Sequence, residues 1–167
     1  SASPDALAVE FGERVVAIGR ILRRHGSLGA FLSRVSEEGR LPLRQGLSAF
    51  VRGLRAAEPR FERPSRASFH LLPDPAGGSA CKRLNLFLRW MVRPDDGIDL
   101  GLWDAYRPAD LVIPLDVHVR RAAHILGLSE RRTPDWKMAV EVTAALALAA
   151  PRDPLRYDFH LCHLGML

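Results

Sequence analysis

Apolar residues recur along much of the chain at spacings of three and four, the period of one face of an α-helix. The first such stripe is Leu7, Phe11, Val15, Ile18 and Leu22. Ser3-Pro4-Asp5 precedes the stripe with a cap residue, a first-turn proline and an early acid, and Gly26 follows it as a stop signal. The pattern predicts a helix between these two signals, with the stripe on its buried side.

Similar periods and boundary signals predict the remaining helices, and no segment alternates apolar and polar residues as a half-buried strand does. The expected ranges are 28–36, 43–57, 80–93, 116–126, 134–149 and 153–164. Ser79 and Thr133 are expected to cap two of these helices. The sequence therefore predicts an all-α fold of about seven helices, arranged as a two-lobed bundle.

Residues 59–78 interrupt the helical pattern with four prolines and the pair Gly77-Gly78, a composition typical of a loop. A chain of 167 residues is long enough for one domain with a sizeable core. We therefore expect a single helical domain over residues 1–167, in which lobes 1–58 and 79–167 are joined by this loop.

The composition narrows the class of protein. Apolar residues make up 47% and charged residues 26%, values that are typical of globular proteins and exclude extended disorder. The longest uncharged apolar run, Val142 to Ala150, is too short to cross a bilayer, and the first residues do not resemble a signal peptide. Two cysteines cannot build a disulfide framework, which fits a reduced compartment. We expect a cytoplasmic protein with no membrane partner.

Basic residues exceed acidic ones, giving a formal net charge of +5 and a pI near 10, which suits a polyanionic partner. All the basic residues except Lys82 and Lys137 are arginines. An amine can lose its proton and attack carbon, whereas a guanidinium cannot. The two lysines therefore deserve separate consideration as nucleophiles.

The segment KRLNLFLRWMVR, residues 82–93, follows the glycine pair and has helical period. On a helix, Lys82, Asn85, Arg89 and Arg93 share one face. Such a face can contact the phosphates of DNA, and its simpler interpretation is a solvated surface. Asp116, in IPLDVHV, is expected to cap a later helix, and a carboxylate fixed at a helix start is also suited to catalysis.

A lysine that opens one helix, followed by an aspartate in a V/P-V-D-x-H setting that opens a later one, resembles the helix-hairpin-helix (HhH-GPD) DNA glycosylase superfamily. The motifs KRLNLFLRWMVR, DLGLW, IPLDVHV, LGL and RYDFHLCHLG are similar to an uncharacterised bacterial family, a distant branch of that superfamily. The spacing from Lys82 to Asp116 is closest to that of archaeal 8-oxoguanine glycosylases. The usual L-P-G-V-G hairpin is absent.

The resemblance implies a DNA glycosylase/AP lyase that removes an oxidised purine from double-stranded DNA. Lys82 would attack the sugar C1′, Asp116 would activate the amine, and a Schiff base would permit strand cleavage after the base is flipped out. We assign DNA contacts to Asn85, Arg89, Arg93 and His118. Trp103, an aromatic residue in a loop, is assigned to the wall of a base pocket. The protein would then associate with the nucleoid.

A group of residues near the C-terminal end of the sequence contains types that ligate zinc: Asp158, His160, Cys162 and His163. On a helix only pairs of them share a face, so we expect no metal and no other cofactor. Two alternative functions stay open. One is a catalytically inactive helical DNA-binding module, and the other is a helical protein-interaction scaffold whose arginines reflect codon use.

Overall fold

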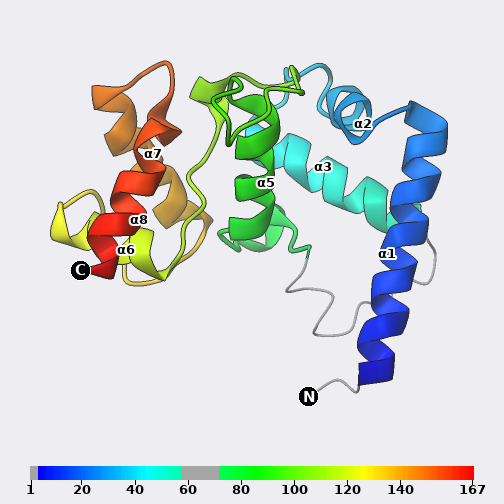
Figure 1. Ribbon diagram of the computed structural model, residues 1–167, viewed down its shortest axis with the longest axis horizontal. Helices are drawn as coiled ribbons and strands as arrows, with labels where there is room; N and C mark the ends of the chain where they lie inside the picture. Colours follow the sequence, from blue (N-terminus) through cyan, green and yellow to red (C-terminus); the bar gives the residue numbers. More distant parts are fainter. Residues whose placement is uncertain (1–3, 58–71) are drawn as a thin grey trace. The chain divides into compact units, whose positions relative to one another are not determined.

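The computed structural model describes residues 4–57 and 72–167, and within these ranges the chain is helical (Figure 1). The described residues form seven α-helices and three short 3₁₀ helices. Their one β feature is an isolated bridge between Ser79 and Asp135. The predicted all-α class and number of helices are confirmed. No described helix is long and apolar enough to cross a bilayer.

The chain divides into two compact units, residues 1–76 and 77–167. The first contains α1 (Pro4–His25), α2 (Leu28–Val35) and α3 (Leu43–Ala56), and the 3₁₀ helix η2 (Pro75–Gly77) lies at the boundary. Most of the predicted loop 59–78 lies outside the described residues. The core of the first unit is formed by Ala17, Ile21, Phe31, Leu32, Leu43, Leu47, Phe50, Val51 and Leu54.

Helix α1 buries a different face from the predicted one. Ala17 and Ile21 are buried, whereas Val15, Ile18 and Leu22 are 53%, 37% and 41% exposed. The side chains of Leu7 and Phe11 lie outside the described part of the chain. Residues 17 and 21 also repeat at a helical spacing, so the period is right and packing against α2 and α3 selects the face.

The second unit contains four α-helices with their connecting segments. They are α5 (Lys82–Val92), α6 (Val117–Ile125), α7 (Trp136–Ala149) and α8 (Asp158–Met166), with the 3₁₀ helices η3 (Pro108–Asp110) and η4 (Pro154–Tyr157). Helices α6 and α8 lie side by side (Figure 1). The largest fully buried apolar side chains here are Leu88, Leu111, Ile113, Met138, Leu155, Val119 and Val142.

Helix α5 begins two residues later than predicted, and Ser79 is not its cap. Cys81 occupies the cap position in a left-handed backbone conformation, with φ of 48°. The Ser79 hydroxyl instead accepts the backbone N–H of Cys81 at 3.2 Å. The left-handed residue turns the chain sharply before α5, so that Lys82 is the first residue of the helix.

Helix α7 likewise begins at Trp136, and Asp135 rather than Thr133 is its cap. The Asp135 carboxylate accepts the backbone N–H of Met138 at 2.8 Å. The N–H of Trp136 donates to the carbonyl of Gly78 at 2.9 Å. These contacts hold the start of α7 against the segment that leads into α5.

The segment before α6 is buried from Leu111 to Leu115. The N–H of Ile113 donates to the Thr143 hydroxyl at 3.0 Å, and that hydroxyl donates to the carbonyl of Ala139 at 2.7 Å. Because this buried segment is bonded to α7, the point where α6 begins is fixed within the unit.

Helix α8 approaches α6 most closely at Gly165. A Cβ atom at this position would overlap the backbone carbonyl of His118, so the contact requires glycine. The Nδ1 atom of His118 lies 3.5 Å from the carbonyl oxygen of Gly165. The first turn of α6 is therefore held directly against α8.

Candidate active site

The amine of Lys82 and the carboxylate of Asp116 meet at the starts of α5 and α6. Lys82 Nζ lies 3.2 Å from Asp116 Oδ2. The Lys82 side chain is 48% exposed and that of Asp116 is 16% exposed. The fold thus brings together two residues far apart in the sequence, and it leaves the amine accessible to a large ligand.

Asp116 uses its two oxygens for different tasks. Oδ1 accepts the backbone N–H of Val119 at 2.8 Å, so the expected cap of α6 is confirmed. Burial acts to raise the pKa of Asp116, but hydrogen bonds from the Val119 N–H and the Lys82 ammonium outweigh it and leave this pKa below its usual value. The carboxylate is therefore ionised at neutral pH, and Oδ2 faces the amine.

Three of the four residues on the predicted polar face of α5 are buried. Asn85, Arg89 and Arg93 are only 1%, 2% and 8% exposed. Their assignment to phosphate contacts stays a prediction, and this burial does not favour it. They share a helix face with Lys82, as helical spacing predicts, but that face is covered by other parts of the second unit.

Arg89 lies between two carboxylates. Its Nη1 atom is 3.2 Å from Asp158 Oδ2 and its Nη2 atom is 3.3 Å from Asp99 Oδ2. The centre of the guanidinium also lies 4.4 Å from the centroid of the Phe159 ring, a cation–π contact. Since Asp158 and Phe159 belong to α8, Arg89 joins α5 to α8.

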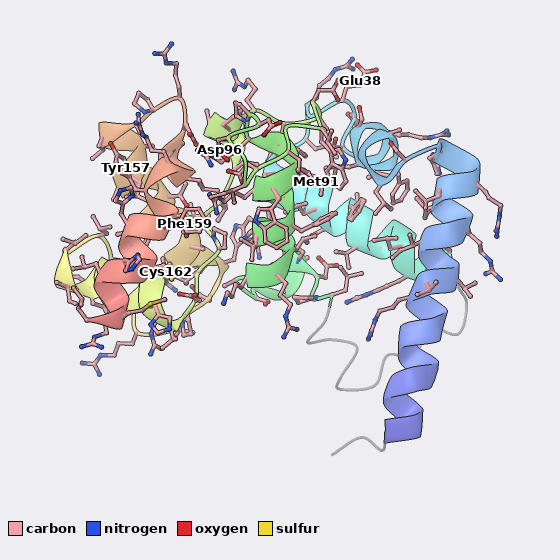
Figure 2. The ribbon with its side chains drawn as sticks, in the orientation of Figure 1. Glu38, Met91, Asp96, Tyr157, Phe159 and Cys162 are labelled. Carbon is pink, nitrogen blue, oxygen red and sulfur yellow. The ribbon has the colours of Figure 1, made fainter. Side chains whose placement is uncertain are left out.

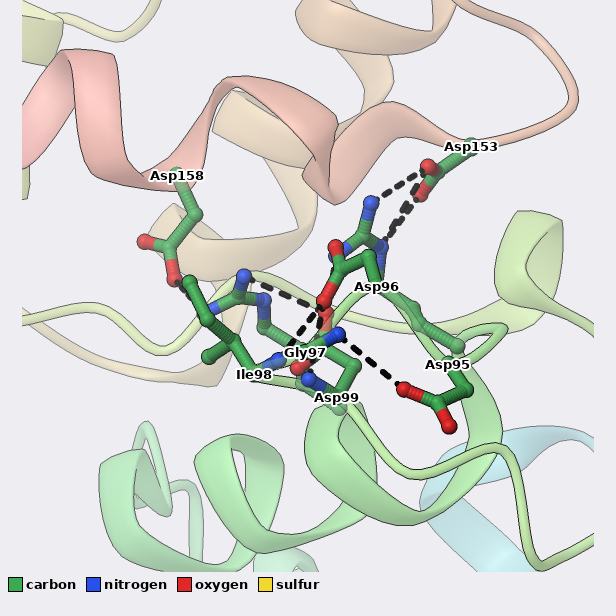
Figure 3. A network of polar contacts seen from close by, with 9 residues as sticks. Asp95, Asp96, Gly97, Ile98, Asp99, Asp153 and Asp158 are labelled. Atoms are coloured by element: carbon green, nitrogen blue, oxygen red, sulfur yellow. Dashed lines mark hydrogen bonds and ion pairs between the residues drawn. The ribbon is translucent and has the colours of Figure 1, made fainter.

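Arg93 extends this arrangement toward η4. Its Nε and Nη2 atoms bind the two oxygens of Asp153 at 3.0 and 2.8 Å, and its Nη1 atom contacts Asp99. The five residues Asp153, Arg93, Asp99, Arg89 and Asp158 form an alternating series that we term the buried ionic chain. Figure 3 shows Asp153 and Asp158 at its two ends. The buried ionic chain fixes α5 relative to α8, and α8 in turn contacts α6.

Asp158 is the carboxylate of this chain with the most perturbed titration. Burial raises its pKa to about 6, Arg89 opposes the rise, and the negative charges of Asp116 and Asp99 add to it. Burial also raises the pKa of Asp99. Because the charge of Asp116 acts on Asp158, the buried ionic chain ends within electrostatic reach of the Lys82–Asp116 pair.

The group of potential zinc ligands in α8 does not come together. Across residues 4–57 and 72–167, no three His, Cys, Asp or Glu residues are placed to hold a metal ion. Cys162 lies on α8 (Figure 2). Burial and the carboxylates of Asp116 and Asp158 raise the pKa of its thiol. The thiol is therefore uncharged at neutral pH, and the expectation of no metal or cofactor stays a prediction.

His118 and Trp103 contact different parts of the second unit. His118 is half-buried and faces α8 through its contact with Gly165. The ring of Trp103 meets that of Phe87 edge-on, with centroids 5.2 Å apart. Phe87 lies about 140° around α5 from Lys82. The structure therefore does not bring Trp103 to the Lys82–Asp116 pair, and its role in a base pocket stays a prediction.

Sequence reasoning missed the acidic partners of α5. Arg89 and Arg93 stand among apolar residues of one helix, and buried charges in proteins are paired. This pattern predicts that carboxylates lie nearby. The sequence offers many aspartates, however, and nothing in their spacing selects Asp99, Asp153 and Asp158.

Residues 9–167 match the model of a family described as "Protein of unknown function (DUF2400)". No curated protein and no solved structure matches the chain. The family match covers nearly the whole sequence, and it includes no link to the helix-hairpin-helix glycosylases. That part of the resemblance therefore stays a prediction.

Proposed function

The chain belongs to the DUF2400 family, and we propose that it is a DNA glycosylase with AP lyase activity on an oxidised purine in double-stranded DNA. The observation that supports the proposal most is the 3.2 Å contact between Lys82 Nζ and Asp116 Oδ2. The resemblance of these positions to the lysine and aspartate of helix-hairpin-helix glycosylases supplies the substrate class. The protein then acts on chromosomal DNA in the cytoplasm.

In the first step, Asp116 accepts a proton from the Lys82 ammonium, and the free amine attacks C1′ of the flipped nucleotide. The Nζ–C1′ bond forms as the bond from C1′ to the base breaks. The electron pair of that bond leaves with the base, which takes up a proton. Asp116 supplies the proton that the base takes up, and the carboxylate, ionised again, stabilises the positive charge that develops on the sugar.

In the second step, the sugar ring opens at C1′ and leaves a Schiff base between Lys82 and the sugar. Removal of a C2′ proton then expels the 3′ phosphate by β-elimination, and water releases the amine. Asp116 suits both steps because it is ionised and its direction is fixed by its hydrogen bond to Val119.

Borohydride trapping tests this proposal. The protein is incubated with duplexes that contain 8-oxoguanine, another oxidised purine or an abasic site, and the covalent adduct is measured. We expect Lys82→Gln to lose trapping but keep its affinity for the duplex. Asp116→Asn should slow base release strongly, because it cannot accept the proton.

The chain offers a matched control. Lys137 is the other lysine of the sequence and is exposed, so Lys137→Gln should trap as wild type does. Abasic sites react slowly with any accessible amine, and this comparison removes that background. Equal trapping by wild type and Lys82→Gln across the lesions would contradict the proposal. Retained DNA affinity would then favour an inactive DNA-binding module, and its absence a protein-interaction scaffold.

A further inference from the structure

A concavity of about 370 Å³ lies on the outer face of α6. Four of its residues follow one another at helical spacing on that face, and the fifth comes from the loop after α6. They are Val117, Arg120, Arg121, His124 and Arg132. We term it the α6 concavity, and it belongs entirely to the second unit.

Within residues 4–57 and 72–167, the three arginines of the α6 concavity have no acidic partner. Among the residues that the structure describes, Arg120, Arg121 and Arg132 form no ion pair, and the lining contains no Asp or Glu. The neighbouring Arg131, in contrast, pairs with Asp135 at 3.0 Å. Three like charges around one hollow repel one another, so an anion that enters it is attracted by all three.

The chemistry of the lining selects a particular anion. A guanidinium presents a planar fork of donors that matches phosphate oxygens, and it stays charged at every physiological pH. Val117 is 61% exposed and adds an apolar surface beside these donors. A ligand with phosphates linked by less polar groups fits this combination, and the backbone of a nucleic acid has that composition.

The position of the concavity relates it to the candidate active site. Val117 directly follows Asp116, so the concavity begins at the helix turn that carries the Lys82–Asp116 pair. Helix α6 has nine residues and is about 13 Å long. Phosphates of one DNA strand advance by about 3.4 Å per nucleotide along the duplex axis. A strand with one nucleotide at the pair can therefore place neighbouring phosphates along α6.

We infer that the α6 concavity binds the phosphodiester backbone of the DNA strand whose nucleotide enters the Lys82–Asp116 pair. The inference rests on the proposed function for the identity of the polymer. The sequence suggested the polar face of α5 for this contact, and the inference assigns it instead to a surface whose arginines form no ion pair with the residues that the structure describes.

Binding is measured by fluorescence anisotropy with a short labelled duplex that carries a tetrahydrofuran abasic analogue, which cannot form a Schiff base. A plot of log affinity against log salt has a negative slope, and each lost phosphate contact makes it less steep by about one. We expect this change for each of the single variants Arg120→Gln, Arg121→Gln and Arg132→Gln, and a change of about two to three for the triple variant. The triple variant should bind at least about tenfold more weakly at low salt. Arg152→Gln, an exposed arginine of the same unit, is the matched control and should leave the slope unchanged.

Slopes and affinities of the three variants equal to those of Arg152→Gln would overturn the inference. So would unchanged DNA binding accompanied by lost affinity for a glutamate-rich peptide, because the concavity would then recognise carboxylates. Circular dichroism checks that the triple variant keeps its helices. Borohydride trapping separates the two proposals. If wild type forms no covalent adduct but its DNA binding still depends on these arginines, only the proposed function is contradicted. Normal trapping and binding by the triple variant contradicts only this inference.

Discussion

Arg89 and Asp158 form an ion pair of 3.2 Å in which the arginine is 2% exposed and the aspartate carboxylate 10% exposed. The pair connects α5, whose first residue is Lys82, to α8, which contacts the first turn of α6 at His118. Removing both charges from water costs free energy, which the mutual attraction offsets only while both partners are present. The distance between Lys82 and Asp116 thus depends on a contact that neither residue makes.

Replacement of Arg89 by methionine should destabilise the protein by about 3 to 5 kcal/mol, because Asp99 and Asp158 would stay buried without their shared partner. The free energy of unfolding in urea measures the effect. Arg152→Met removes an exposed arginine from the same unit and should change stability by about 0.5 kcal/mol or less. A loss below about 1 kcal/mol for Arg89→Met would contradict the structural role of the buried ionic chain.

The titration of Asp158 should make stability depend on pH. Its pKa is about 6 in the folded protein and 3.8 in an ordinary environment, so the folded state binds the proton more tightly. The resulting contribution to stability is fully present below pH 3.8 and is lost as the pH rises through about 6. Relative to Asp158→Asn, wild type should lose up to about 3 kcal/mol across that window. Urea unfolding at a series of pH values measures the difference, and a constant difference between wild type and variant would refute the assignment.

Substitutions at Asp116 should separate capping from chemistry. Asp116→Ala removes the acceptor for the Val119 N–H and should cost about 1 to 2 kcal/mol. Asp116→Asn keeps a capping oxygen and should cost clearly less, while still failing to accept a proton from Lys82. Thermal unfolding compares the two variants, with Asp135→Ala at the start of α7 as a second lost cap. Equal costs for Asn and Ala would show that the cap contributes little.

A methyl group at Gly165 should separate α8 from α6. The new Cβ would overlap the backbone carbonyl of His118, which cannot rotate away as a side chain does. We expect Gly165→Ala to cost at least about 2 kcal/mol in unfolding experiments. Gly19→Ala lies in α1 where a Cβ meets nothing within 4 Å, and it should be neutral or stabilise by up to about 1 kcal/mol. Similar effects of both substitutions would argue against the close contact.

Local signals account for the part of the fold that was predictable. The glycine at 26, the cap at Asp116 and the glycine at 127 mark helix ends through their own backbone preferences, and the structure has helix ends at all three. The predicted cap at Thr133 was wrong because Asp135, two residues later, caps α7, and the predicted cap at Ser79 was wrong because α5 begins after Cys81 in a left-handed conformation. These two helix starts depend on tertiary contacts, such as the hydrogen bond from the Trp136 N–H to the carbonyl of Gly78.

Burial was less predictable than helix position. Helical spacing correctly grouped Asn85, Arg89 and Arg93 on one face, but whether that face meets water depends on aspartates that are distant in the sequence. Charge alone favours the surface, and here specific pairing overrides it. The Lys82–Asp116 pair was anticipated by a family resemblance, since neither periodicity nor spacing predicts a contact between residues of different helices.

The buried ionic chain has a consequence for how the sequence can change over time. Arg89 pairs with Asp99 and Asp158, and Arg93 pairs with Asp99 and Asp153, so loss of either arginine leaves a carboxylate at the end of the buried ionic chain without its partner. Tolerated changes should therefore come in groups, and positions 89, 93, 99, 153 and 158 should covary among homologues. A lineage that has lost the whole set would have freed α5 from α8. In such a lineage, the contact between Lys82 and Asp116 would have to be maintained by other interactions of α5 and α6.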